Sequence, residues 1–98
     1  MKNTINTISF SANKKLVDFI NIKVKKLSLF YNHILSSKIF LKIDRKKSVS
    51  NKITEIKINV PGGELFACKK SNSFEQSFRL AILAIQKQIK KYKKKNNF

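Results

Sequence analysis

The sequence predicts an α+β domain with the element order β-α-β-β-β-α, in which two helices pack on one face of a four-stranded sheet. Two amphipathic segments, with apolar residues three and four positions apart, indicate helices over residues 14–30 and 73–94. Four shorter segments rich in Ile, Val, Thr and Phe indicate strands. Because the alternating strands each have one apolar face, both helices are expected on the same side of the sheet.

The first strand is expected over residues 4–10, where TINTISF is rich in β-branched side chains. Ile5 and Ile8 are three positions apart and would face opposite sides of a regular strand, which suggests a bulge between them. Ser11 and Asn13 both suit the N-cap of the helix that follows. The apolar stripe of that helix comprises Leu16, Phe19, Ile20, Val24, Leu27 and Phe30.

Three more strands are expected after a turn at Asn32-His33, and short connections should make them an antiparallel meander. Residues 37–44 and 53–60 alternate between apolar and polar side chains and are separated by a basic loop. Pro61-Gly62-Gly63 then makes a tight turn into the last strand, residues 64–69. The side chains expected to face the helices are Ile39, Leu41, Ile43, Ile56, Ile58, Val60, Leu65 and Ala67.

The last helix is expected to begin after Ser73, which forms an S-x-x-Q capping box with Gln76. Its final turns are rich in lysine, which the negative end of the helix dipole favours, and residues 96–98 should fray. The buried stripe of this helix comprises Phe74, Phe78, Ala81, Ile82, Ile85, Ile89 and Tyr92. Residues 1–98 contain no repeat and are expected to form one domain.

The charge of the chain is its most unusual property. There are 22 Lys plus Arg against 5 Asp plus Glu, for a formal net charge of +17. An A/T-biased genome would explain the abundance of Lys, Ile and Asn, and the use of Lys in place of Arg, but it would not explain the scarcity of acids. Such an excess repels itself in the compact state and predicts a polyanionic partner.

Few residues could carry enzymatic or metal chemistry. His33 is the only histidine and falls in a predicted turn, and Cys68 is the only cysteine. Neither a metal site nor an oriented nucleophile pair is expected from two isolated residues, so the sequence predicts no enzyme, no cofactor and no small-molecule substrate. The polar N-terminus and the lack of an apolar run of ~18 residues predict a cytoplasmic protein without membrane contact.

Clusters of lysine on the helices are the strongest candidate site. If the two helices pack side by side, the clusters should merge into one stripe that neutralises several phosphates of a nucleic acid. The alternative is a solvated face that only aids solubility, but few acids alternate with these lysines. The candidate RNA-binding residues are Lys23, Lys26, Lys87, Lys90, Lys91 and Lys94.

The opposite face of the sheet offers a rival site. Phe40, Phe66 and Cys68 are expected to point away from the helices. Exposed aromatic side chains on a sheet can stack single-stranded bases, although the strand order differs from that of RRM modules. The two phenylalanines could instead simply pack on each other.

Three segments together resemble the ribosome hibernation-promoting factor family, also called the ribosome-associated inhibitor or sigma-54 modulation family. They are KLVDFINIKVKKLSLFY, INVPGGELFA and SFEQSFRLAILAIQKQIKKYK, and the likeness covers nearly the whole chain in the same element order. The resemblance implies the β-α-β-β-β-α fold, which is similar to double-stranded RNA-binding domains with an extra first strand.

The resemblance also implies a function. The family binds the small ribosomal subunit and its 16S rRNA at the decoding centre of the 70S ribosome, where it blocks tRNA and mRNA and protects idle ribosomes. The family's rRNA-contacting basic positions match Lys23 and Lys26 on one helix and Lys87 and Lys91 on the other, with Lys90 and Lys94 extending the same surface. The chain departs from the pattern at Ala84, where several relatives carry a basic residue.

Long members of the family continue into a second domain that pairs two ribosomes. The resemblance is therefore to a short member, with residues 1–98 as a single ribosome-binding domain, no C-terminal dimerisation domain, and a monomeric state off the ribosome. Two further hypotheses stay open: a general nucleic-acid coater held only by charge, and a protein-interaction modulator of transcription.

Overall fold

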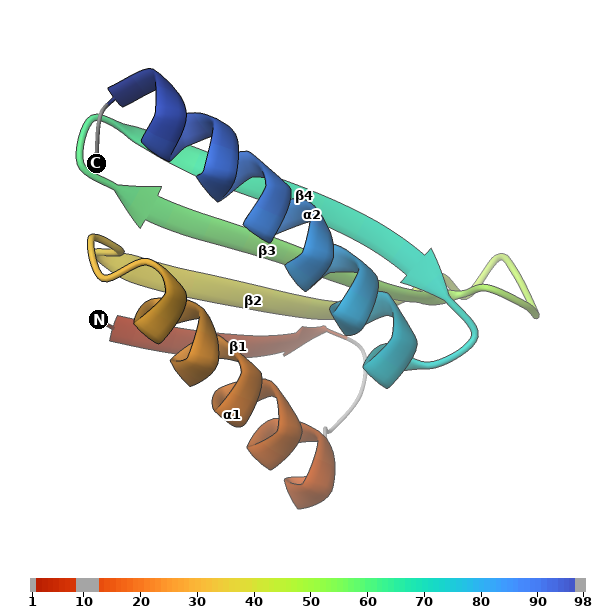
Figure 1. Cartoon of the computed structure of the whole chain (residues 1–98). Coiled ribbons are helices and arrows are strands. Elements are labelled where there is room, and N and C mark those ends of the chain that lie inside the picture. The colour runs from red at the N-terminus through yellow and green to blue at the C-terminus, as the bar shows by residue number, and fades with distance from the viewer. Residues whose placement is uncertain (1, 9–12, 97–98) are drawn as a thin grey trace.

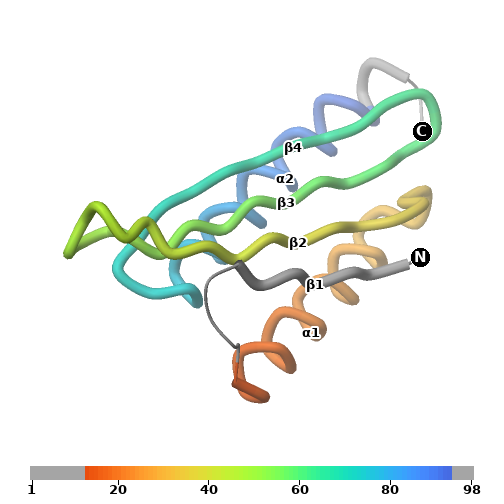
Figure 2. The backbone as a smooth tube through the Cα atoms, turned by 180° about the vertical axis from the view of Figure 1, so that it is seen from behind, coloured from red at the N-terminus to blue at the C-terminus, as the bar shows by residue number. Residues whose placement is uncertain are grey.

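Two helices lie on one face of a sheet in the computed structural model, which describes residues 2–8 and 13–96 (Figure 1). The elements are β1 (Lys2–Ile8), α1 (Lys14–Phe30), β2 (Ser36–Ile43), β3 (Lys52–Val60), β4 (Gly63–Ser71) and α2 (Phe74–Asn96). Seen from behind, the other face of the sheet has no helix across it (Figure 2). The predicted α+β class and the pair of helices on one face are confirmed.

The strands β2, β3 and β4 form the predicted antiparallel meander. Ile39 is opposite Ile56, and Ile56 is opposite Ala67, so an apolar row crosses all three strands on one face. The backbone of β1 runs parallel to β2 at the edge of the sheet, a pairing that needs a crossover, and α1 provides it. The register between β1 and β2 is continuous over residues 2–8, so the bulge predicted there is wrong.

The core lies between the two helices and the sheet. The predicted inward residues Ile39, Leu41, Ile56 and Ile58 are all fully buried against the stripes of both helices. One prediction about α1 is wrong, because Phe30 is 41% exposed. The helix ends at Phe30, and the extended backbone of Tyr31 at the C-cap turns the next side chain into the core instead.

Both helices begin at capping residues. The backbone N–H of Leu16 donates to Asn13 Oδ1 at 2.8 Å, so Asn13 is the N-cap of α1, while Ser11 lies outside the described residues. The N–H of Gln76 donates to Ser73 Oγ at 3.2 Å, which is one half of the predicted capping box. These bonds satisfy N–H groups that have no partner within a helix.

The β3–β4 turn is fixed by its residue types. Pro61 and Gly62 occupy the two central positions, since Val60 pairs with Gly63, and Gly62 has a φ of +84°. A positive φ at the position after proline is what a type II turn requires, and glycine adopts it without strain. The hydroxyl of Tyr92 on α2 donates to the Pro61 carbonyl, which ties the C-terminal part of that helix to the turn.

Candidate nucleic-acid interface

Helix α1 places two of the predicted lysines beside α2. Lys23 is half-buried and Lys26 is exposed, and both line a groove between the helices. Their positions follow from the apolar stripe, because Ile20, Val24 and Leu27 are buried against the core and fix which flank of α1 meets its neighbour. Part of the predicted basic surface therefore lies at the junction of the two helices.

Arg79 is the principal residue of this site that sequence reasoning missed. Its guanidinium carbon lies 5.3 Å from the centre of the Phe19 ring, and the ammonium of Lys23 lies 5.7 Å from the same ring. Phe19 also meets Phe78 of α2 in an edge-to-face contact, with 5.9 Å between ring centres. One aromatic ring of α1 thus holds a cation from each helix through cation–π attraction.

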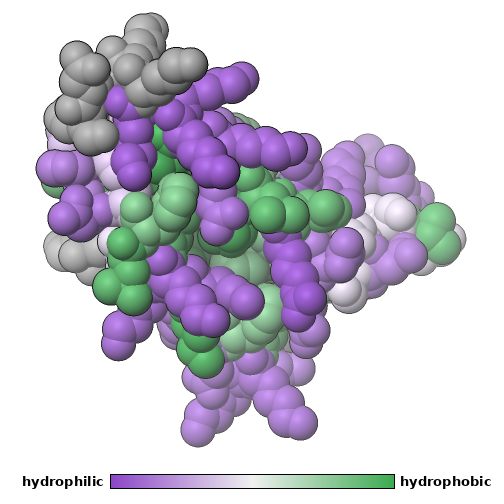
Figure 3. Space-filling view, in the orientation of Figure 1, coloured by the Kyte–Doolittle hydropathy of each residue, from purple (hydrophilic) through white to green (hydrophobic). Residues whose placement is uncertain are grey.

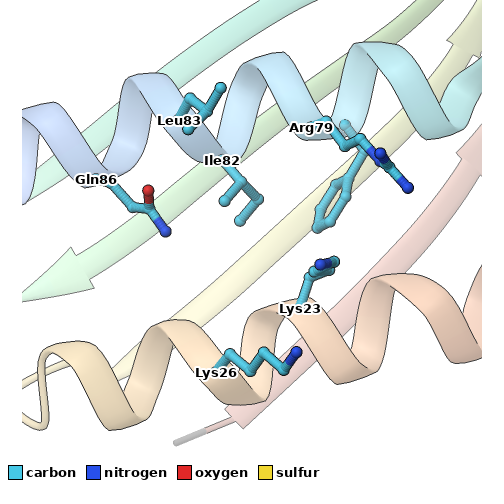
Figure 4. Close-up of a pocket in the computed structure, with 7 residues that line it drawn as sticks. Lys23, Lys26, Arg79, Ile82, Leu83 and Gln86 are labelled. Carbon is cyan, nitrogen blue, oxygen red and sulfur yellow. The ribbon is translucent and has the colours of Figure 1, made fainter.

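The groove between the helices has both apolar and cationic lining and a volume of about 310 Å³. Figure 4 shows Lys23 of α1, and Ile82 and Gln86 of α2, pointing into the space between the helices, while Lys26 lies along α1. In Figure 3, hydrophobic side chains gather between the helices and hydrophilic ones surround them. The residues that line the groove are Lys23, Lys26, Phe78, Arg79, Ile82, Leu83 and Gln86.

A second contact between the helices lies near the end of α1. The ammonium of Lys93 on α2 lies 5.1 Å from the centre of the Phe30 ring and 5.7 Å from that of Tyr31. Phe30 is therefore exposed, but the ammonium of a lysine from the other helix lies near its ring. Lys93 was absent from the predicted site, although its neighbours in the sequence were included.

The other predicted lysines of α2 lie further from α1. Lys87, Lys90 and Lys91 are exposed, and none of them lines the groove. Lys87 follows Leu83, and Lys90 follows Gln86, by four positions, so these lysines continue along the helix surface from the groove toward the C-terminus. The side chain of Lys94 lies outside the described residues. Arg79 and Lys93, which the predicted stripe did not include, are cations of α2 that approach aromatic rings of α1.

No described residue of this surface forms an ion pair with a carboxylate. Among the residues that the structure describes, the ion pair joins Lys42 and Glu55, whose side-chain atoms are 2.6 Å apart on β2 and β3. These positions share the outer sheet face with Phe40 and Phe66, away from the helices. This ion pair therefore lies on the face of the sheet opposite the helices.

The aromatic side chains of the rival site, on the outer sheet face, lie apart from each other. Phe66 is 44% exposed on β4, and Phe40 is half-buried on β2 with the Lys57 ammonium 5.7 Å from its ring centre. Strand β3 separates the two rings, since Phe66 is opposite Lys57 and Phe40 is opposite Glu55. The two rings therefore do not pack on each other, which was the alternative that the sequence left open.

The two residues considered for catalysis lie on different elements of the fold. His33 is exposed in the turn after α1 with its ring 5.3 Å from that of Tyr31, and Cys68 is exposed on β4. Across the described ranges, no group of three His, Cys, Asp or Glu side chains is placed to hold a metal ion. No helix in the described part of the chain is long and apolar enough to cross a membrane.

Comparison with known proteins gives a family and a fold. The model of the family described as sigma 54 modulation protein / S30EA ribosomal protein matches residues 4–97. The structure is similar to that of a ribosomal subunit interface protein from Coxiella burnetii, with a TM-score of 0.84 and 19% identity over 95% of this chain and 98% of that one. It is also similar to the N-terminal domain of Thermus thermophilus Protein Y, with a TM-score of 0.79 and 16% identity over 94% of this chain and 99% of that one. No curated protein matches the sequence.

Proposed function

Because the chain belongs to the sigma 54 modulation protein / S30EA ribosomal protein family, we propose that it binds the ribosome and silences it. The target is the 16S rRNA of the small subunit near the decoding centre, in the free subunit and in the 70S ribosome. Bound there, the protein occupies the space of tRNA and mRNA and so inhibits translation and protects idle ribosomes in the cytoplasm. It acts as a monomer off the ribosome, and no catalytic step is involved.

The observation that carries this proposal is the cationic surface shared by both helices. Arg79 and Lys23 approach the same Phe19 ring, and Lys26 lines the same groove. None of these three side chains has a carboxylate partner within residues 13–96. Cations held on packed helices can dock as a preformed surface and release counterions from several phosphates at once.

The proposed contacts extend along α2 through the remaining lysines. Lys87, Lys90 and Lys91 are exposed, and Lys94 follows them in the sequence. Ala84 is half-buried, so the basic residue that several relatives carry there is replaced by a side chain that reaches no phosphate. Arg79, five positions earlier on the helix, supplies a further cation at the groove.

The test is co-sedimentation with purified ribosomal particles, followed by in vitro translation. The wild-type protein is expected with 30S subunits and 70S ribosomes and not with free 50S subunits. A variant with Lys87→Glu and Lys91→Glu should lose binding and inhibition together, because inhibition arises from occupancy alone. Equal recovery on 50S subunits would instead identify a general nucleic-acid coater.

A control variant with the same net charge separates the helix face from the sheet face. Lys38 and Lys70 are exposed on the outer sheet face, and reversing both with Lys38→Glu and Lys70→Glu removes the same charge. Lys42 is unsuitable as a control because it is paired with Glu55. If this variant loses 30S binding while the helix variant keeps it, the docking surface is the sheet and the proposal is wrong.

A further inference from the structure

The groove between α1 and α2 combines buried and open apolar surface. Phe78 and Ile82 are 0% and 8% exposed and form its floor, while Leu83 on the same helix is 54% exposed. Leu83 thus leaves apolar surface open to solvent beside the buried floor of the groove. The volume of about 310 Å³ lies at the lower end of the ~300–1,000 Å³ typical of small-ligand sites.

The rim of the groove selects an anion. Lys23 and Lys26 line it from α1, and Arg79 lines it from α2, so cations stand on both sides of the apolar floor. No acidic residue is among the lining side chains. A ligand that suits both parts has an apolar body and a negatively charged group at its edge.

Gln86 adds a directional polar group at the α1 side of α2. Its half-buried side chain extends toward α1 in Figure 4. An amide offers one acceptor oxygen and two donor hydrogens, which match the mixed donor and acceptor edge of a nucleobase. A ligand with only aliphatic surface would leave this amide without a partner.

We propose that the groove binds one unstacked nucleotide of single-stranded RNA, with its base on Ile82 and Leu83 and its phosphates among Lys23, Lys26 and Arg79. This inference rests on the proposed RNA-binding function and adds a base-reading subsite to it. Proteins recognise unstacked RNA bases by placing them against flat or apolar side chains and by hydrogen bonding to their edges. A free mononucleotide has the same chemistry, and the experiment separates the two sources.

The size of the groove favours a nucleotide over a protein segment. The volume of about 310 Å³ is on the scale of a small ligand, and a single nucleobase is a group of that scale. A docked helix, with a diameter of ~10 Å including its side chains, needs a much longer and wider channel. A nucleobase satisfies the volume, the charge and the amide together.

The experiment measures whether affinity depends on the base. Fluorescence anisotropy compares a labelled five-nucleotide RNA with an abasic strand that has the same ribose-phosphate backbone and charge. The wild-type protein is expected to bind the base-bearing strand about tenfold more tightly. Equal affinity for the two strands overturns the proposal. AMP that binds as tightly as the pentanucleotide overturns RNA as the source of the ligand.

Matched variants locate the effect. Leu83→Gln and Gln86→Ala should each remove most of the preference for the base-bearing strand without changing the charge. Leu80→Gln is the control, because Leu80 is an exposed residue of the same helix that does not line the groove. Circular dichroism checks the fold of all three variants. A preference that survives both groove changes, or that disappears in the control, contradicts the proposed position of the base.

Methyl chemical shifts and co-sedimentation with 30S subunits distinguish RNA binding in the groove from the other outcomes. Methyl chemical shifts of Ile82 and Leu83 should respond to the pentanucleotide. A response to an acidic amphipathic peptide and not to RNA assigns the groove to a protein partner and overturns the proposal. Co-sedimentation of the wild-type protein with 30S subunits is scored separately, so a base preference without 30S binding rejects only the proposed function, and 30S binding without base preference rejects only the groove.

Discussion

Gln88 of α2 satisfies both backbone groups of Phe66 on β4. Its Nε2 donates to the Phe66 carbonyl oxygen at 2.7 Å, and the Phe66 N–H donates to its Oε1 at 3.2 Å. Because β4 is an edge strand, its outer backbone groups could otherwise pair with a strand of another molecule. One side chain thus attaches the helix to the sheet and blocks strand addition at Phe66.

Changing Gln88→Ala is expected to lower the free energy of unfolding by about 1–2 kcal/mol, since two hydrogen bonds are lost and the freed groups are still partly solvated. Urea denaturation measures the change, and amide hydrogen exchange at Phe66 should become faster. Gln86→Ala is the control on the same helix, because its amide makes no hydrogen bond among the described residues. An equal loss of stability in both variants would contradict a specific role for the Gln88 clamp.

Tyr31→Phe is expected to stabilise the protein by about 1 kcal/mol. The Tyr31 side chain is 2% exposed, and its hydroxyl has no hydrogen-bond partner in the described part of the chain. Without the hydroxyl, no polar group is buried without a hydrogen bond at this position, and the ring contacts with Tyr92 and His33 stay in place. Thermal and urea denaturation should both show the gain, and a loss of stability would reveal a partner for the hydroxyl.

The same variant should change the alkaline limit of stability. Burial, and then the nearby charge of Tyr92, raise the pKa of Tyr31 above its ordinary value. Below that ordinary value both folded and unfolded chains hold the proton, so there is no effect. As the pH rises further, the unfolded chain loses its proton first, and stability falls until the pH passes the folded pKa. Tyr31→Phe should lack this component, so its advantage over wild type should grow as the pH rises above the ordinary pKa of tyrosine.

The hydroxyl pair of Thr54 and Ser77 predicts which of two substitutions costs more stability. Their oxygens are 2.7 Å apart and fully buried, and Ser77 Oγ also donates to the Phe74 carbonyl at 3.2 Å. Thr54 must then be the donor to Ser77. Ser77→Ala strands the Thr54 hydroxyl and should cost about 1–3 kcal/mol, whereas Thr54→Val leaves the bond to Phe74 and should cost less.

A double-mutant cycle tests the pairing of the two hydroxyls. Adding Thr54→Val to Ser77→Ala should recover part of the lost stability, because no buried hydroxyl then lacks a partner. The free energies of unfolding come from urea denaturation of all four proteins. Simple additivity of the two single changes would contradict the pairing.

Much of the fold was predictable because periodicity reports which side of each element is apolar. The limits of α1 and the inward residues of β2 and β3 follow from spacing alone, and Asn13 and Ser73 cap the helices as their side-chain chemistry suggests. The burial of Thr54 could not be predicted from its own strand, because a buried hydroxyl needs a hydrogen-bond partner. That partner, Ser77, lies 23 positions later in the sequence, on α2. Tyr31 is buried in place of Phe30 because α1 ends at Phe30, and periodicity does not predict the last residue of a helix.

The candidate site was less predictable than the fold. Spacing separates the apolar side of a helix from its polar side, but it does not say which polar flank meets the neighbouring helix. Arg79 and Lys93 contact α1 only because of how the two helices pack, so counting lysines directed attention to Lys87 and Lys91. A cation next to an aromatic stripe residue, as Arg79 is next to Phe78, was the available signal.

The last prediction separates the positioning of cations from their number. Phe19 holds Lys23 and Arg79 through its ring, with ammonium and guanidinium groups 5.7 and 5.3 Å from its centre. Phe19→Leu keeps an apolar side chain against the core and keeps every charge, but it removes the surface on which both cations rest. The affinity for RNA should fall by about tenfold, because each cation–π contact is worth ~0.5–1 kcal/mol at an exposed site.

The salt dependence distinguishes this effect from the loss of a phosphate contact. In Phe19→Leu the slope of log affinity against log salt concentration should stay the same, since the same cations still displace counterions. Lys26→Gln is the matched comparison, because it removes one cation of the groove without touching Phe19, and its slope should become shallower by about 0.7–0.9. Fluorescence anisotropy at several salt concentrations gives both values, with circular dichroism to confirm that each variant is folded. A shallower slope in Phe19→Leu would mean that the ring keeps a cation in contact with phosphate, and not only in position.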